Sequence, residues 1–230
     1  MRPVVVVSAK RTPIGSFGGA LSSFSAAELG AMAIYEVLKE AGIPAENVDE
    51  VIFGHVLAAG AGQAPVRQAL IKAGLPHHVP ATAVNKVCAS GMRSVMVAMD
   101  QIALGHADMI VAGGMESMSQ VPYYLSSQRF GSKLGHTQAE DGILKDGLWD
   151  VYNDYHMGSA AELCARECSI SREEQDAFAI ESYKRAQNAQ ESGAFDAERF
   201  EVKVMGRKGD ATMVRDDEEL AKHSLIASLP

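Results

Sequence analysis

The sequence predicts an α/β fold in which helices cover a mostly parallel β-sheet. Apolar runs typical of buried strands recur through the first half of the chain, and segments with helical spacing separate them. The strand-like runs occupy residues 4–9, 48–57, 81–87 and 109–115. Strands that alternate with helices in this way form layered α/β domains with right-handed crossovers.

The first strand and the first helix are marked by different patterns. Val4 to Ala9 is a continuous, β-branched run before the turn residues Thr12-Pro13-Ile14-Gly15, so it predicts a buried strand. A helix follows, because apolar residues recur at helical spacing until Gly42 and Pro44 end it. These apolar residues are Ala26, Leu29, Ala33, Val37 and Ala41.

Two more helices are predicted in the first half. One occupies residues 65–73, and the other begins just beyond Cys88. The second of these carries an apolar face made of Met92, Val95, Met96, Met99, Ile102 and Ala103. We interpret its methionines, together with Met115 and Met118, as core packing, because methionine fills irregular gaps in protein interiors.

The second half of the chain has a different character. Gly, Ser, Tyr, His and acidic residues dominate from Ser119 to Gly158, with no long periodic segment. Ser171 and Glu174 then form a capping-box pattern, which predicts a helix running to about Ser192. We therefore expect two domains, an α/β domain over residues 1–118 and a loop-rich α+β domain over residues 119–230.

The composition excludes several classes of protein. Hydrophobic residues make up 47% of the chain and charged residues 22%, which are ordinary globular values. No apolar stretch approaches the roughly 18 residues of a membrane span, and the net charge of −8 argues against a nucleic-acid surface. Three cysteines and the lack of a basic, then apolar leader before Val4 predict a reducing compartment, the cytoplasm, with mitochondria and peroxisomes as open alternatives.

Cys88 is the candidate nucleophile. It lies between a predicted strand and a helix, where unpaired backbone N–H groups and the positive end of the helix dipole favour a thiolate. Ala89, Ser90 and Gly91 keep the surroundings small, so that a substrate carbonyl can reach the sulfur. Judged only by residue type and setting, Cys88 could equally be a buried cysteine that acts as a small hydrophobic residue.

The chain resembles the thiolase family over essentially its whole length. The matching segments are VVVVSAKRTPIGSFGG at the start, GQAPVRQA at 62–69, NKVCASGM at 85–92, VAGGMESMS at 111–119, KDGLWDVYNDYHMGSAAE at 145–162 and SREEQDAFAIESYKRA at 171–186. Several long matches in order are far more specific than one short motif. Within the family, the chain looks most like the members that form or cleave acetoacetyl-CoA.

The resemblance implies a thiolase-like layered fold and an acyltransferase. Such an enzyme joins two acetyl-CoA molecules into acetoacetyl-CoA, or cleaves acetoacetyl-CoA with free coenzyme A, through an acetyl group carried on Cys88. Residues 119–230 would then cover the active site, with Leu148, His156 and Met157 lining the pantetheine and acyl tunnel and Lys222 near the nucleotide. The resemblance also implies that the full-length protein forms a homodimer or homotetramer. It implies coenzyme A thioesters as the substrates, with no cofactor and no metal.

The family pattern is incomplete in these residues. Thiolases take an activating histidine, a second cysteine and further oxyanion donors from a C-terminal domain. The Gly-His-Pro and Cys-x-Gly-Gly-Gly motifs of that domain are absent here. The missing portion also supplies the last strand of the first domain. We therefore expect residues 1–230 alone to be inactive and to leave an apolar face uncovered.

Alternatives remain open for the function and for several residues. A β-ketoacyl synthase also uses a cysteine at a helix start, and a truncated, non-catalytic protein would bind acyl-CoA without turnover. His156 has a structural alternative as a histidine bonded to backbone, and most of the other histidines are interpreted as solvated loop or helix-end residues. Cys164 and Cys168 are spaced i, i+4 on a predicted helix, which favours core packing over a zinc site.

Overall fold

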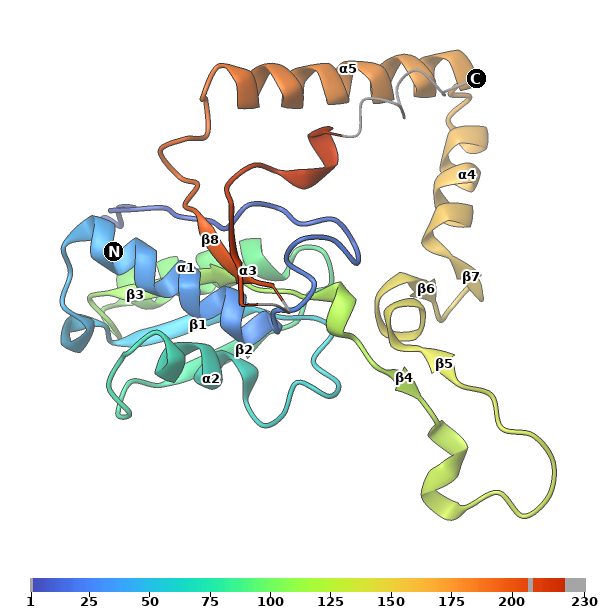
Figure 1. Cartoon of the computed structure of the whole chain (residues 1–230), viewed down its shortest axis with the longest axis horizontal. Coiled ribbons are helices and arrows are strands. Elements are labelled where there is room, and N and C mark those ends of the chain that lie inside the picture. Colours follow the sequence, from blue (N-terminus) through green and yellow to red (C-terminus); the bar gives the residue numbers. More distant parts are fainter. Residues whose placement is uncertain (1, 207–208, 222–230) are drawn as a thin grey trace. The chain divides into compact units, whose positions relative to one another are not determined.

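The computed structural model describes residues 2–206 and 209–221, which form two compact units (Figure 1). The first unit comprises the described residues up to 10 together with 22–147, and the second comprises 11–21 together with those from 148 onward. The sequence-based domain boundary at 118–119 stays a prediction. None of the helices in the described part of the chain has the length and hydrophobicity needed to cross a membrane.

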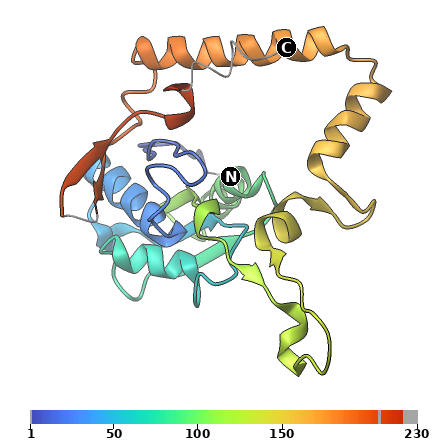
Figure 2. The same ribbon diagram turned by 45° about the vertical axis from the view of Figure 1, so that its right-hand side comes forward.

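The first unit is built on a three-stranded parallel sheet, as predicted. Strands β1 (Glu50–Gly54), β2 (Ala81–Val84) and β3 (Ile110–Gly114) lie in the order β2-β1-β3. Helices α1 (Ala26–Ala41) and α2 (Pro65–Lys72) pack against each other on one face, and α3 (Ser90–Leu104) covers the other (Figure 1). Figure 2 again shows α1 and α2 side by side. The unit is therefore a three-layer α/β structure.

The central strand β1 divides its side chains between the two layers. Val51 and Phe53 join the core formed with α1 and α2, where Ile34 and Leu70 are also fully buried. Successive strand residues point to opposite faces, so Ile52 and Gly54 face α3. Burying each large apolar side chain contributes roughly 1.5–3 kcal/mol, which makes this cluster the main stabilising element of the unit.

Helix α1 has the predicted bounds. Its N-terminus is a capping box between Ser25 and Glu28, and Gly42 ends it in the left-handed conformation. The buried residues are Ala26, Ala27, Gly30, Ala31, Ile34 and Leu38, and Val37 packs against the same core. Packing is close at Gly30, where a Cβ would lie 2.6 Å from the sulfur of Met115.

The predicted first strand is not formed. Residues 4–9 have no regular secondary structure, Val5, Val6 and Val7 are 67–81% exposed, and no strand of the described chain pairs with them. The residues on either side are held by side chains, since Arg2 Nε donates to the carbonyl of Ile102 at 3.0 Å and Lys10 Nζ lies 3.3 Å from a carboxylate oxygen of Glu40. A β-branched run favours extended backbone, but a strand also needs a neighbour to take its hydrogen bonds.

Helix α3 turns its small residues, not its methionines, toward the sheet. Its buried residues are Ser90, Ser94 and Ala98, while the side chains of Met92, Val95, Met96 and Met99 are 46–71% exposed. The core-packing interpretation was therefore wrong for these methionines and for the exposed Met118, and right for Met115. The helix start approaches the ends of β1 and β3 so closely that only small side chains fit between them.

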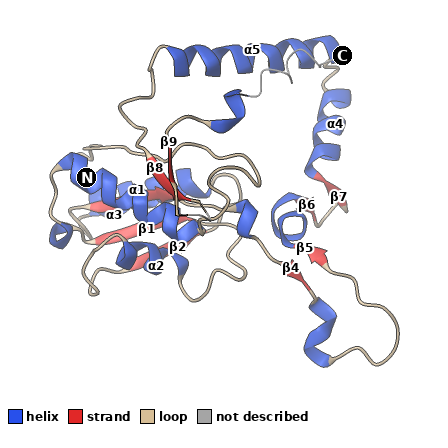
Figure 3. Cartoon of the chain, in the orientation of Figure 1, coloured by secondary structure: helices blue, strands red, loops and turns tan. Residues whose placement is uncertain are grey.

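Short elements connected by loops follow β3, as predicted for residues 119–158 (Figure 3). They are η2 (Met118–Gln120), β4 (Tyr123–Tyr124), η3 (Ser126–Phe130), β5 (Glu140–Asp141) and the π-helical η4 (Leu144–Leu148). The hairpin of β6 (Trp149–Asp150) and β7 (Tyr155–His156) then leads into the helices of the second unit.

The second unit contains two helices, a second hairpin and a short terminal helix. In chain order these are helices α4 (Met157–Glu167) and α5 (Arg172–Glu191), strands β8 (Val202–Met205) and β9 (Ala211–Val214), and the short 3₁₀ helix η5 (Glu218–Ala221). The other short helix, η1 (Ala45–Asn47), belongs to the first unit. Both halves of the predicted capping box at α5 are present, between Ser171 and Glu174. Cys164 and Cys168 are exposed at the end of α4, so the prediction that they pack in a core was wrong.

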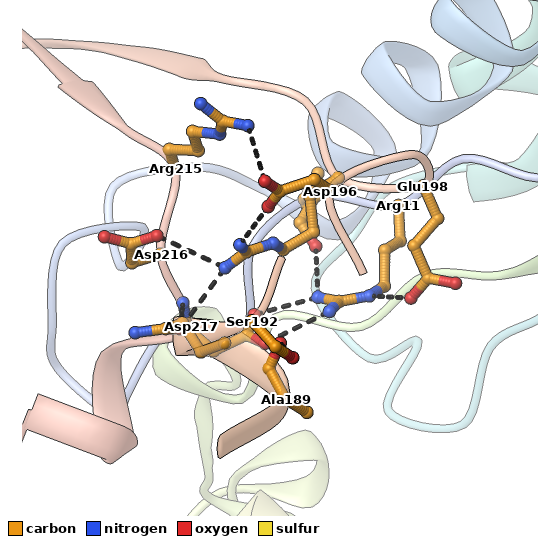
Figure 4. Close-up of polar contacts among 11 residues, drawn as sticks. Arg11, Ala189, Ser192, Asp196, Glu198, Arg215, Asp216 and Asp217 are labelled. Carbon is orange, nitrogen blue, oxygen red and sulfur yellow. Dashed lines mark hydrogen bonds and ion pairs between the residues drawn. The ribbon is translucent and has the colours of Figure 1, made fainter. Parts of the chain in front are cut away.

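Two arginines organise the polar interior of the second unit (Figure 4). Arg11 forms ion pairs with Glu198 at 2.5 Å and with both carboxylate oxygens of Asp217 at 2.8 and 3.1 Å. The buried Arg199 reaches Asp196 at 2.7 Å and Asp216 at 3.2 Å. Arginine forks match carboxylate geometry, so the Arg11–Asp217 pair holds residue 11 against the segment near the end of the described chain.

The Arg11–Asp217 pair predicts lower stability in acid. Burial raises the pKa of Asp217, but hydrogen bonds from Arg11 and from the Ile14 N–H outweigh it and lower that pKa overall. The pair's stabilisation is thus present above the unfolded pKa, about 4, and is lost as pH falls through the folded value. Urea unfolding at pH 7 and pH 3 should show that Asp217→Asn removes about 0.2–1 kcal/mol at pH 7 only. An equal loss at both pH values would contradict the assignment.

Candidate active site

Cys88 lies in a tight turn between β2 and α3. Strand β2 ends at Val84, three residues earlier than predicted, and α3 begins at Ser90 with Ala89 as its N-cap. Cys88 is a free, exposed thiol two residues before the first helical residue. The alternative of a buried, inert cysteine therefore does not hold for the described chain.

Side-chain hydrogen bonds fix the backbone of this turn. The amide oxygen of Asn85 accepts from the Val87 N–H at 3.0 Å. The Ser90 hydroxyl accepts from the Lys86 N–H at 2.8 Å and lies 2.6 Å from the Val87 carbonyl, to which it donates. The residues on both sides of Cys88 are thus held by short polar side chains, which favour such local bonds.

Val87, directly before Cys88, has a left-handed backbone with φ of 49°. A β-branched residue in this region is a conformational outlier and costs of order 1–3 kcal/mol. The surrounding hydrogen bonds offset that strain and present the next residue, Cys88, at the tip of the turn. This backbone conformation was not predictable from the residue type, because a β-branched residue such as valine is not expected at positive φ.

The strain at Val87 predicts that glycine stabilises the turn. Val87→Gly should raise the free energy of unfolding by about 0.5–1 kcal/mol, because glycine adopts positive φ without steric cost. Urea unfolding provides the measurement. Val87→Ala is the matched control, since it shortens the side chain but keeps the Cβ that causes the strain. If both variants change stability equally, backbone strain is not the cause.

Three glycines bring the start of α3 against the ends of two strands. A Cβ on Gly54 would lie 2.5 Å from the backbone nitrogen of Gly91, and one on Gly114 would lie 3.4 Å from the Gly91 Cα. The Ser94 hydroxyl, 2.6 Å from the carbonyl oxygens of both Gly91 and Gly113, ties α3 to β3. Helix α3, which follows Cys88, is therefore positioned by direct backbone contact with the sheet.

A buried His55–Glu116 pair lies at the same edge of the sheet. The His55 N–H donates to the Val84 carbonyl at 3.1 Å, next to the turn that carries Cys88. Its Nε2 lies 3.3 Å from a Glu116 carboxylate oxygen, and its side chain is only 1% exposed. Glu116 also accepts from the Val56 N–H at 2.9 Å. His55 is therefore an exception to the expectation that most histidines are solvated.

The local sequence contains a signal for this pair. His55 directly follows a buried strand, and Glu116 comes two residues after the neighbouring parallel strand. Residues at the carboxyl ends of adjacent parallel strands converge. Neither ring nitrogen of His55 makes a well-aligned hydrogen bond within the described residues. The pair therefore lies next to the strand end that leads into the Cys88 turn.

The three predicted tunnel residues of the second unit lie close together. In the β6–β7 register Trp149 is opposite His156, which places Leu148 and Met157 at the same end of the hairpin. His156 is the N-cap of α4, and its Nδ1 accepts from the Gly158 N–H at 2.8 Å. His156 therefore has the backbone bond that its structural alternative predicts. The second ring nitrogen of His156, Nε2, does not take part in that bond. Lys222 lies outside the described residues.

Comparisons with known proteins agree on one family. A family model described as the thiolase N-terminal domain matches residues 4–230. Acetyl-CoA acetyltransferase 2 of Arabidopsis thaliana is 54% identical over 96% of the chain, and acetyl-CoA acetyltransferase of Cupriavidus necator is 48% identical over 100%. A mitochondrial acetyl-CoA acetyltransferase of Danio rerio is 54% identical over 96%. The chain covers 55%, 58% and 52% of these relatives respectively, about half their length.

Proposed function

Because the chain belongs to the thiolase family, we propose that its protein is an acetyl-CoA C-acetyltransferase. It would join two acetyl-CoA molecules into acetoacetyl-CoA, or cleave acetoacetyl-CoA with free coenzyme A. The observation that supports this most directly is Cys88, an exposed thiol at the tip of a fixed turn before α3. Relatives named acetyl-CoA acetyltransferase at about 50% identity support the choice of acetyl donor.

In the proposed reaction the Cys88 thiolate attacks the carbonyl carbon of acetyl-CoA. The tetrahedral intermediate collapses, the bond to the coenzyme A sulfur breaks, and an acetyl-cysteine remains. The Cys88 backbone N–H, at the start of α3, is proposed as one oxyanion donor. A second acetyl-CoA, deprotonated at its α-carbon, then attacks the acetyl group and releases Cys88 as thiolate. In the reverse direction, the thiol of free coenzyme A attacks the acetyl group on Cys88 instead.

The substrate would be held by residues of the second unit. Leu148 and Met157 are proposed to contact the pantetheine and acyl groups, and His156 to donate or accept through Nε2 there. Lys222 is proposed to meet the nucleotide phosphates. Coenzyme A thioesters are the only partners proposed besides further copies of the chain, with no cofactor and no metal ion.

We also propose a homodimer or homotetramer in a reducing compartment, the cytoplasm. The exposed methionine face of α3 supports association, because contiguous exposed apolar surface marks interaction sites. Three free cysteines support a reducing environment. Sedimentation analysis tests the first statement, and a monomer at micromolar concentration would contradict it.

Acetylation of the 230-residue chain tests the role of Cys88. With acetyl-CoA, intact-mass analysis should show one added acetyl group, which peptide mapping places on Cys88 and not on Cys164 or Cys168. Cys88→Ser is the control and should remain unmodified. We expect no thiolysis of acetoacetyl-CoA by these residues alone, because loss of even one oxyanion donor costs roughly 10²–10³ in rate. Binding of acetyl-CoA without acetylation would favour the non-catalytic alternative.

A further inference from the structure

The exposed thiols of Cys164 and Cys168 form a pair that the proposed reaction does not use. Both lie in the second unit at the end of α4, and both are exposed. Core packing therefore does not explain them. Their spacing places them one turn apart on the same side of the helix.

The backbone holds the two thiols one helical turn apart. The Cys168 N–H donates to the Cys164 carbonyl at 2.9 Å, so helical geometry extends through the pair. The neighbouring Cys168 thiol raises the pKa of Cys164, through hydrogen bonding and then through its charge. The helix thus holds two soft donor atoms side by side at its accessible end.

Helical spacing favours a bridging atom over a direct disulfide. Residues i and i+4 have Cβ atoms about 5–6 Å apart in a helix, whereas a disulfide needs about 3.5–4.5 Å. A single atom bonded to both sulfurs at about 2.3 Å, a typical metal–thiolate length, spans the larger gap. A disulfide would instead require the last turn of α4 to unwind.

The number of ligands narrows the class of bridging atom. Structural zinc needs four ligands, and residues 2–206 and 209–221 contain no cluster of three or more His, Cys, Asp or Glu side chains placed to hold a metal ion. A trivalent metalloid that carries one organic group needs only two more bonds. Soft thiolates are the donors that such soft centres prefer.

We propose that Cys164 and Cys168 form a dithiol site for trivalent arsenicals and chemically similar soft metalloids. With an organic arsenous oxide, two S–H bonds break, two As–S bonds form, and the oxygen leaves with both protons as water. No atom changes oxidation state. The product closes a ring across the last turn of α4 and stabilises that turn.

Phenylarsine oxide tests the site in the Cys88→Ser background, which removes the remaining thiol. Native mass analysis should show one phenylarsenic group per chain, bound with loss of one water and retained in excess glutathione. Adding Cys164→Ser or Cys168→Ser should weaken retention about 10²–10⁴-fold, because the second As–S bond becomes intramolecular only in the pair. Hydrogen exchange at the Cys168 amide should slow on binding.

A spacing control separates the geometry from the number of thiols. In the Cys88→Ser background, Glu162→Cys with Cys164→Ser keeps two thiols but places them six residues apart, on different sides of the helix. Retention in this variant equal to that of the Cys164–Cys168 pair would overturn the proposal. Absence of a glutathione-resistant adduct in a chain with normal helical circular dichroism would overturn it as well.

Discussion

Replacing Gly54 by alanine is expected to displace the start of α3, which follows Cys88. The added Cβ would lie 2.5 Å from the Gly91 nitrogen and from the Ser90 carbonyl carbon, which are backbone atoms that no rotamer change can move. Overpacking of this kind costs typically 1–3 kcal/mol. Urea unfolding should show that loss, and acetylation of Cys88 by acetyl-CoA should fall with it, because the start of α3 must shift.

Gly113→Ala is the matched control for this experiment. It also adds a methyl group to a strand glycine, but there the new Cβ would meet only the edge of the Phe53 ring at 3.4 Å. Stability and Cys88 acetylation should stay close to those of the unmodified chain. If both variants lose the same stability, close backbone contact is not what positions α3.

Removing the carboxylate of Glu116 is the second change with a large expected effect. Glu116→Ala should lower the free energy of unfolding by roughly 1–3 kcal/mol, because the Val56 N–H and the buried His55 ring lose their partner. Urea unfolding measures the loss. Alkylation of Cys88 by iodoacetamide should also become slower. The reason is that the His55 backbone N–H bonds to the Val84 carbonyl, where the segment that leads into the Cys88 turn begins.

Glu116→Gln distinguishes an acceptor role from a charge role. The amide oxygen keeps a hydrogen-bond acceptor for the Val56 N–H but removes the negative charge beside His55. We expect it to retain more than half of the stability that alanine loses. Equal losses in the two variants would show that the charge next to His55, and not the bond to the loop, stabilises this edge.

The helix ends were predictable from the sequence, and the reason is local chemistry. The Ser25–Glu28 and Ser171–Glu174 boxes and the glycine at 42 act within four residues of each other, so their pattern is complete in the printed sequence. The alternation of strands and helices likewise predicted the parallel sheet. The position of Cys88 before a helix was predicted for the same reason.

Features that depend on distant residues were not predictable in the same way. The run at 4–9 has strand propensity, but pairing requires a neighbour that propensity does not supply. The buried face of α3 was misassigned because it depends on residues outside the helix: Ser90 lies against Gly54, and Ser94 donates to the carbonyl of Gly113. The pairing of His55 with Glu116, 61 positions later, likewise exists only once β1 and β3 lie side by side.

The contact among Gly54, Gly91 and Gly114 also has a consequence for folding order. Its members come from three elements joined by long crossovers, and the closure of such distant segments is slow compared with formation of single helices. Helix α3 can therefore form early, while the turn before it reaches its native shape only after β1 and β3 have paired. The reactivity of Cys88 should mature late during refolding, which makes this thiol a time-resolved reporter of sheet assembly.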